Sequence, residues 1–299
     1  MGAVITSLGD RVFDAVNRLG LLLVTLVVLY PLVYVVSASI SNPAYVNTGQ
    51  MWLWPIDITF DGYRRVLENP DIWTGYRNTI LYTVLGTCFN LLLTIPCAYA
   101  LARKDLYGRN FITGIFLVTM FFNGGLIPTY LVIKNLNLLD TPWVLMIVGG
   151  ASVWNLIVAR TFFQNTIPRE LEEAAEVDGC SHLSLFLRVI LPISGPIIAV
   201  MALFYGVAHW NQYFNAMMYL QSRSLYPLQL FLREILIVNE MSANMMMDGE
   251  SMAAMAEQAK IADIIKYAVI IISALPLLIV YPFVQRFFIK GILIGSLKG

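Results

Sequence analysis

Six long apolar runs constrain this chain more than any other feature of its sequence. Each is long enough to cross a bilayer, which takes about 20 residues in an α-helix. The runs lack the dyad alternation of membrane strands, so helices must satisfy their backbone groups within lipid. The sequence therefore predicts an all-α, polytopic membrane protein with six transmembrane helices, over 19–40, 78–102, 111–133, 141–163, 193–220 and 264–285.

The composition excludes several other classes of protein. Only 13% of the 299 residues are charged, half the share of about 25% found in soluble domains, so much of the surface must face membrane lipid. The net charge is zero, which gives no electrostatic basis for a nucleic-acid partner. Two histidines without an H-E-x-x-H motif predict no metal site, and no catalytic set of residues is found.

A short basic loop predicts which side of the membrane each segment faces. Arg103, Lys104 and Arg109 lie together between the second and third runs, and such clusters stay in the cytoplasm. With an even number of spans, both termini then lie there too. The predicted organisation is a cytoplasmic amphipathic helix at 1–18, a transmembrane domain at 19–285 with outer loops at 41–77 and 221–263, and a cytoplasmic tail at 286–299.

The inner loop between the fourth and fifth runs, residues 164–192, predicts a cytoplasmic hairpin of two short helices. Pro168 suits the first turn of one helix, and Gly179 ends that helix in a left-handed conformation. Ser181 caps the second helix, which Pro192 closes. Its buried face is predicted from apolar residues at helical spacing, namely Leu183, Phe186, Leu187 and Ile190.

The hairpin also carries a recognisable spacing, E-A-A-x3-G-x9-I-x-L-P, with Val189 in the isoleucine place. It resembles the signature loop of permease subunits of binding-protein-dependent ABC importers. Residues 281–299 are similar to the end of the second, maltose-type sugar permease. Residues 121–143 and 210–220 resemble the oligosaccharide and complex-sugar branch of that family. The specified residues of the loop are Glu173, Ala174, Ala175, Gly179, Leu191 and Pro192.

This resemblance implies a permease subunit that forms half of the membrane pathway for ATP-driven sugar uptake, with an oligosaccharide as the expected substrate. It implies a second, homologous permease, two cytoplasmic ATPase subunits and an extracytoplasmic sugar-binding protein, assembled in the bacterial cytoplasmic membrane. The chain lacks the G-x-x-x-x-G-K-[ST] phosphate loop. ATP and Mg are therefore expected in the partner ATPases, and this chain is expected to be non-catalytic and to bind no cofactor.

The resemblance further implies which residues meet the ATPases. The coupling residues are Glu173, Ala174, Ala175, Asp178, Gly179, Phe186, Leu191 and Pro192. The tail residues expected between the ATPase subunits are Gly295, Ser296, Leu297, Lys298 and Gly299. A disordered basic tail at the membrane surface is the alternative for this last group.

The sugar path is predicted from polar and aromatic residues within the spans. Amides hydrogen-bond sugar hydroxyls and indoles present apolar faces to sugar rings, although the same residues also join helices to each other. Gly124, Gly125 and Pro128 predict a break in the third span. The candidates for the path are Asn123, Trp154, Asn155, Trp210, Asn211, Tyr213 and Asn215.

Two alternatives stay open at this point. Importers of polyamines, phosphate or peptides share the Glu-Ala-Ala core of the loop. An ion-coupled carrier is less favoured, because His209 is the only ionisable residue in the central parts of the runs and such carriers keep charged residues at membrane depth.

Overall fold

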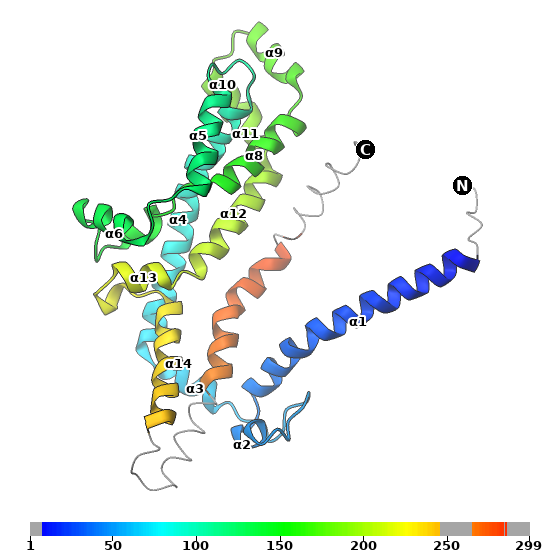
Figure 1. Cartoon of the computed structure of the whole chain (residues 1–299), viewed down its shortest axis with the longest axis vertical. Coiled ribbons are helices and arrows are strands. Elements are labelled where there is room, and N and C mark those ends of the chain that lie inside the picture. Colours follow the sequence, from blue (N-terminus) through cyan, green and yellow to red (C-terminus); the bar gives the residue numbers. More distant parts are fainter. Residues whose placement is uncertain (1–7, 246–264, 284, 286–299) are drawn as a thin grey trace. The chain divides into compact units, whose positions relative to one another are not determined.

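The computed structural model describes residues 8–245, 265–283 and 285 (Figure 1). Within these residues the structure is helical, and the isolated antiparallel bridge between Ser41 and Ile58 is the only strand pairing. The all-α prediction is therefore confirmed for the described residues. The chain divides into two compact units, Met1–Asn69 with Glu234–Ala274 and Pro70–Arg233 with Leu275–Gly299, which we call the first and second units.

The first unit begins with α1 (Leu8–Ser39), a single helix of 32 residues. The sequence predicts a separate surface helix ending at residue 18, but α1 continues through that position without interruption. Gly20 does not break it, because one glycine inside a helix costs only about 1 kcal/mol. A surface location for 8–18 stays a prediction, and residues 1–7 lie outside the described residues.

Two short helices follow α1 in the predicted outer loop, α2 (Pro43–Asn47) and α3 (Asp61–Glu68). Asn42 caps α2 by accepting a hydrogen bond from the backbone N–H of Ala44 at 3.1 Å. A small apolar cluster lies beside them, with Tyr34 meeting Tyr267 edge to face at a ring distance of 6.2 Å. Tyr267 belongs to the helix Ile265–Phe283, which matches the predicted sixth span.

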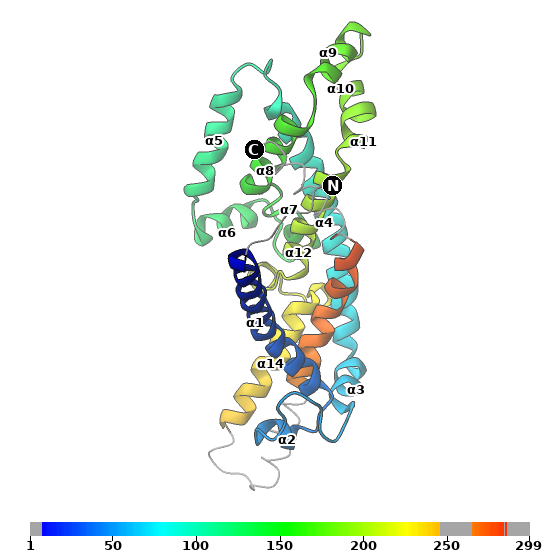
Figure 2. The ribbon, with the colours of Figure 1, turned by 90° about the vertical axis from the view of Figure 1, so that its right-hand side faces the viewer.

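The second unit is built on α4 (Pro70–Ala102), a helix of 33 residues that packs along α12 (Gly195–Trp210) and α8 (Val153–Thr166) (Figure 2). Gly86 allows α4 and α12 to approach closely, because a Cβ there would lie 2.5 Å from the imidazole of His209. Nε2 of His209 is hydrogen-bonded to Oδ1 of Asn90 at 2.6 Å. Asn90 in turn donates to the carbonyl of Gly150 at 2.7 Å, so buried polar groups join α4 to two other segments.

The third predicted span is broken where its sequence predicts a break. It consists of α5 (Arg109–Phe121) and α6 (Leu126–Asn135), which meet at 111°. Gly125 adopts a φ of 82°, which lies in the region that favours glycine. The chain therefore leaves the helical path within the apolar run.

The runs 141–163 and 193–220 are each predicted to form one helix, but neither is a single continuous helix in the structure. The first run divides into α7 (Pro142–Ile147) and α8, because Gly149 between them has a φ of 78°. The second divides into α12 and α13 (Phe214–Tyr219), and α12 continues the preceding helix His182–Ile193 through a bend of 79°. Glycines and short polar turns inside apolar runs are easily overlooked when hydropathy alone defines a span.

These breaks change the number of spans that the described residues support. By length and composition, α1, α4 and Ile265–Phe283 each suit a membrane crossing, and the two bent pairs bring the total to five. The class of polytopic helical membrane protein agrees with this count, whereas a total of six stays a prediction. The predicted outer loop 221–263 contains the short helix η2 (Arg223–Leu225) and α14 (Leu228–Met245), and residues 246–264 lie outside the described residues.

Candidate functional site

The first helix of the predicted hairpin is α9 (Arg169–Val177). Its end is closed by two backbone hydrogen bonds, from Asp178 N–H to Ala174 at 3.0 Å and from Cys180 N–H to Ala175 at 2.9 Å. The second of these is the six-to-one bond of a Schellman motif, which requires a left-handed residue before Cys180. Gly179 supplies it with a φ of 69°, so the predicted glycine stop is confirmed.

The second helix runs from His182 to Ile193 as α10 (His182–Leu185), a π-helical turn η1 (Phe186–Ile190) and α11 (Leu191–Ile193). Ser181 caps it as predicted, accepting from the N–H of Ser184 at 3.3 Å. Pro192 does not close the helix, which continues to Ile193. Proline has no N–H to donate, but Pro192 lies in the first turn of α11, where that group is not required. The bend follows at Ser194.

The predicted apolar face of this second helix is partly wrong. Leu185, Phe186 and Ile190 are buried, whereas Leu183 and Leu187 are 68% and 50% exposed. The side of this helix that is buried is the one that meets the apolar cluster formed with α4, α8 and α12, and Leu185 rather than Leu183 belongs to that cluster. The buried face is therefore displaced relative to the regular helical spacing.

The structure separates the eight predicted coupling residues into two groups. Ala175, Phe186 and Leu191 pack into the apolar cluster that also contains the C-terminal end of α4 and parts of α8 and α12. The others are exposed, namely Glu173, Ala174, Asp178, Gly179 and Pro192. The first group supports the hairpin from beneath, and the second forms a surface that a partner can reach.

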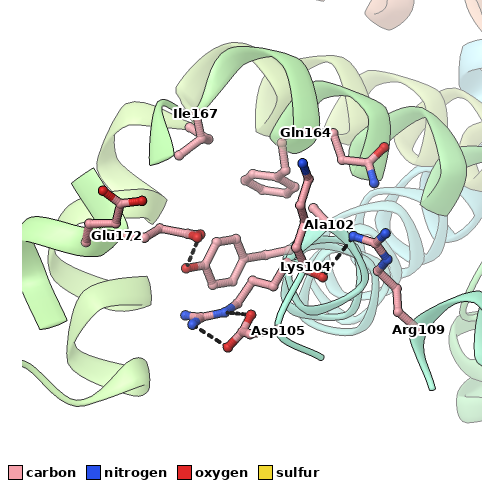
Figure 3. Close-up of a pocket in the computed structure, with 11 residues that line it drawn as sticks. Ala102, Lys104, Asp105, Arg109, Gln164, Ile167 and Glu172 are labelled. Atoms are coloured by element: carbon pink, nitrogen blue, oxygen red, sulfur yellow. Dashed lines mark hydrogen bonds and ion pairs between the residues drawn. The ribbon is translucent and has the colours of Figure 1, made fainter. Parts of the chain in front are cut away.

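A cavity of about 450 Å³ lies beneath α9 (Figure 3). Figure 3 shows Glu172 on one side of this cavity and Arg109 on the opposite side. Lys104 also lines it, while Phe163 and Ile167 provide apolar lining. The cavity thus lies between acidic residues of α9 and two basic residues, Lys104 in the loop after α4 and Arg109 at the start of α5.

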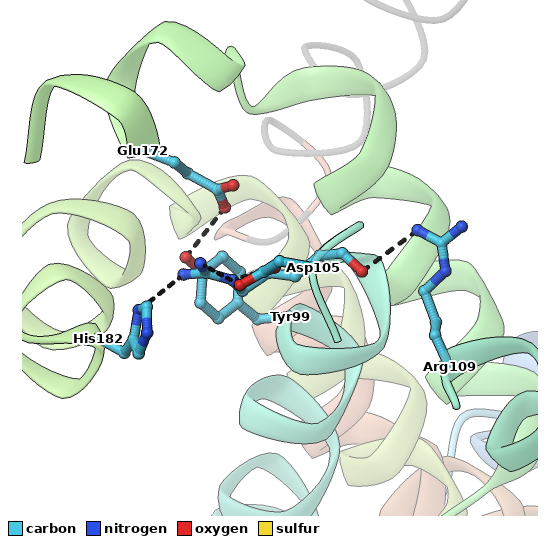
Figure 4. A network of polar contacts seen from close by, with 6 residues as sticks. Tyr99, Asp105, Arg109, Glu172 and His182 are labelled. Carbon is cyan, nitrogen blue, oxygen red and sulfur yellow. Dashed lines mark hydrogen bonds and ion pairs between the residues drawn. The ribbon is translucent and has the colours of Figure 1, made fainter. Parts of the chain in front are cut away.

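A polar network crosses the edge of this cavity (Figure 4). The hydroxyl of Tyr99 donates to Oε1 of Glu172 at 3.0 Å. Arg103 donates to both carboxylate oxygens of Asp105, at 2.8 and 2.7 Å, and to Nδ1 of His182 at 3.1 Å. The hydrogen bonds from Arg103 hold the pKa of Asp105 below its usual range, so this carboxylate is fully ionised near neutral pH.

Sequence reasoning missed this network. In the sequence, Arg103 indicates only the orientation of the chain, and Tyr99 belongs to an apolar run. A signal was present, because an arginine and an aspartate two residues apart directly follow a long apolar helix. The hairpin partners of Tyr99 and Arg103 are distant in sequence, because Glu172 lies 73 residues after Tyr99 and His182 lies 79 residues after Arg103.

The candidate residues of the sugar path fall into different environments. Asn155 and Trp210 are buried, and the ring of Trp210 packs 6.3 Å from that of Tyr76. Asn211 donates to the carbonyl of Val207 in its own helix at 2.9 Å.

The remaining candidates are more accessible. Trp154 and Tyr213 are 61% and 42% exposed, and Asn123 is exposed, although its side chain accepts a bond from the N–H of Gly125 at 3.0 Å. Asn215 is half-buried. The five predicted tail residues, Gly295, Ser296, Leu297, Lys298 and Gly299, lie outside the described residues.

Comparison with known proteins identifies the family. Residues 72–294 match the family described as the inner membrane component of binding-protein-dependent transport systems. The chain belongs to this family. It is also 41% identical to the protein LplC of Bacillus subtilis, over 97% of this chain and 96% of that protein.

Two further similarities concern proteins whose names state a substrate. The polygalacturonan/rhamnogalacturonan transport system permease protein YtcP of Bacillus subtilis is 39% identical, over 97% of this chain and 99% of that protein. The structure is also similar to a chain from the crystal structure of a bacterial ABC transporter involved in the import of the acidic polysaccharide alginate. The two chains have a TM-score of 0.83 and are 35% identical, and the match covers 96% of this chain and 100% of that chain.

Membership of this family settles the general role of the chain. It is a permease subunit of a binding-protein-dependent ABC importer, which is a non-catalytic membrane component. The resemblance inferred from the Glu-Ala-Ala loop is confirmed, and an ion-coupled carrier is excluded.

Proposed function

We propose that this chain forms one half of the membrane pathway through which a bacterium takes up an oligosaccharide. The observation that carries this proposal is the likeness to the alginate importer, which extends over nearly the whole chain at 35% identity. YtcP and the arabinooligosaccharide permease AraQ of Halalkalibacterium halodurans, which is 24% identical, also carry saccharides in their names. Two of these three names denote acidic saccharides, so an anionic oligosaccharide is the first substrate to test.

The break between α5 and α6 supports a role in lining the pathway. Residues Phe122–Gly125 are exposed in this chain and interrupt helical hydrogen bonding within an apolar run. Lipid cannot satisfy such backbone groups, so irregular backbone at membrane depth must face water or another protein chain. A second, homologous permease subunit opposite this face would enclose the route, with Asn123, Trp154 and Tyr213 available to a sugar.

The hairpin supports the proposed coupling to ATP hydrolysis. Its exposed surface around Glu173 and Asp178 is suited to a cleft in a cytoplasmic ATPase subunit, and Gly179 fixes the angle between its helices. Closure of two ATPase subunits around Mg and ATP would then move the hairpin as a rigid body. The basic loop with Arg103, Lys104 and Arg109 supports a cytoplasmic location for this side of the protein and for both termini.

The decisive test is reconstitution of the complete importer in proteoliposomes. The assembly contains this chain, its partner permease, two ATPase subunits and the binding protein, and ATP hydrolysis is measured with candidate solutes. We expect oligogalacturonides or alginate oligosaccharides to stimulate hydrolysis more than neutral arabinooligosaccharides. Stimulation by a polyamine, phosphate or peptide, with none by any saccharide, would contradict the proposed substrate class.

A further inference from the structure

The helix α4 is attached by side chains both to the coupling hairpin and to the outer segment, which we define as residues 221–228. We propose that α4 transmits movement between the hairpin and this outer segment, with Tyr99 and Arg103 as positioning residues at its inner end. The inference rests on the proposed coupling role of the hairpin. It adds a connection that does not pass through α8 or α12, the helices that continue directly from the hairpin in sequence.

At the inner end, α4 is bonded to both helices of the hairpin. Tyr99 donates to Glu172 of α9 at 3.0 Å, and Arg103 donates to His182 of α10 at 3.1 Å. The ring of Tyr99 also stacks on Phe186 with a centroid distance of 5.3 Å. A movement of either hairpin helix therefore acts on the last turn of α4.

The burial of Arg103 gives this attachment its rigidity. Its side chain is 9% exposed, whereas that of Asp105 is 59% exposed. A guanidinium removed from water is held in one geometry by its hydrogen bonds, because losing a partner leaves a buried charge unsatisfied. Arg109 extends the network by donating to the carbonyl of Arg103 at 3.2 Å.

At the outer end, polar residues of α4 bind the outer segment at successive points. Asp71 pairs with Arg223 at 2.7 Å, and Tyr82 donates to the carbonyl of Leu225 at 2.9 Å. The hydroxyl of Thr79 accepts from the N–H of Leu228 at 2.8 Å. The amide of Asn78 donates to the carbonyls of Ser224 at 2.8 Å and Tyr226 at 3.0 Å.

Between these two ends α4 is one continuous helix. Its 33 residues correspond to about 50 Å at 1.5 Å per residue, which exceeds the thickness of the hydrocarbon core. The outer segment lies at the end of the second unit opposite to the hairpin, as both ribbon views show (Figures 1 and 2). A continuous helix that is bonded at each end can move as a unit, so displacement at one end reaches the other.

The experiment uses the reconstituted importer and measures two responses. The first is the factor by which loaded binding protein stimulates ATP hydrolysis. The second is the change in hydrogen–deuterium exchange of residues 221–228 when ATP is added without sugar. We expect Arg103→Ala to lower the stimulation factor about tenfold, a typical size for coupling between distant sites, and to abolish the exchange response.

Matched variants distinguish the loss of a positioning contact from a general loss of folding or assembly. Arg64→Ala removes another arginine that pairs with a carboxylate, Glu68 at 2.9 Å, but at an exposed site, and should behave as wild type. Arg103→Lys keeps the charge and should restore part of both responses. Tyr99→Phe removes one hydroxyl and should weaken the exchange response even if Arg103→Ala fails to assemble.

The outcomes distinguish this inference from the proposal beneath it. Suppose that Arg103→Ala keeps both responses while Gly179→Asp loses them. Transmission through α4 is then wrong, and the coupling role of the hairpin stands. If Arg103→Ala does not assemble, the same comparison is made with Tyr99→Phe. If Gly179→Asp keeps both responses, the hairpin is not the coupling element and both proposals fail.

Discussion

At the scale of single residues, Gly86 determines how closely α4 and α12 pack. A methyl group there would lie 2.5 Å from the imidazole of His209. The imidazole cannot move aside without losing its bond to Asn90 at 2.6 Å. Both helices lie at the centre of the second unit, so an added atom at Gly86 would disturb the packing of α4 against α12.

We therefore expect Gly86→Ala to destabilise the purified subunit by about 1–3 kcal/mol, the usual cost of overpacking. Gly114→Ala is the matched control, because Gly114 lies within α5 and no atom is found within 4 Å of its added Cβ. The control should lose no stability, since alanine favours a helix over glycine by about 1 kcal/mol. Thermal unfolding in detergent measures both, and equal melting temperatures would contradict the packing argument.

Gly179 offers a second prediction at the residue scale. Aspartate and asparagine have the same shape and both tolerate a positive φ, so comparing Gly179→Asp with Gly179→Asn isolates the effect of a negative charge. We expect both variants to insert and fold, because no atom lies within 4 Å of a Cβ built there. Gly179→Asp should abolish uptake, whereas Gly179→Asn should retain part of it. Equal uptake by the two variants would show that charge on this surface does not matter.

At the scale of elements, local chemistry was predictable and long-range contacts were not. The glycine stop at Gly179, the cap at Ser181 and the break at Gly125 follow from backbone conformations that a few neighbouring residues determine. The bond between Arg103 and His182 depends on the packing of elements far apart in sequence. The buried face of the second hairpin helix is not predictable from its own residues, because which side meets the cluster with α4, α8 and α12 depends on the packing of distant elements.

The attachment of the outer segment can be tested by exchanging charges. Asp71→Arg and Arg223→Asp each place like charges together, so each should increase hydrogen–deuterium exchange in residues 221–228. The double variant restores an opposite pair and should return exchange toward wild type. The pair is partly exposed, so its effect on global stability should stay at or below about 1 kcal/mol. A double variant that exchanges as fast as either single variant would contradict a direct pairing.

Asp140 fixes the start of the same segment and predicts a pH dependence. Its carboxylate accepts from the hydroxyl and N–H of Ser222 at 2.5 and 2.8 Å and from the N–H of Gln221 at 2.9 Å. The hydroxyl of Ser222, followed by the two backbone N–H groups, lowers the pKa of Asp140. A lowered pKa in the folded state contributes stability above the unfolded pKa of about 3.9, which is lost as pH falls through the folded value.

The melting temperatures of wild type and Asp140→Asn should therefore differ by a constant amount between about pH 5 and 8. The difference should narrow only below about pH 4, where Asp140 of the unfolded chain begins to take up a proton while the folded carboxylate is still ionised. A difference that narrows near pH 6 would mean that another group controls this segment.

At the scale of the whole molecule, the exposed break between α5 and α6 predicts accessibility to water. In the assembled importer we expect a cysteine at Asn123, with native cysteines replaced, to react with a membrane-impermeant maleimide. A cysteine at Leu22 is the control, because it lies on the exposed apolar surface of α1 and should be shielded by lipid. Absence of reaction at Asn123 in both nucleotide states would contradict its position on the pathway.

The side-chain attachment of α4 to the hairpin limits how members of this family can exchange parts. A chimaera that took residues 168–193 from one relative and residues 99–105 from another would combine two surfaces that do not pack together in either parent, even if each part folded well. Such a hybrid would bind its ATPase and hydrolyse ATP without transporting sugar. Taking both stretches from the same donor would restore transport.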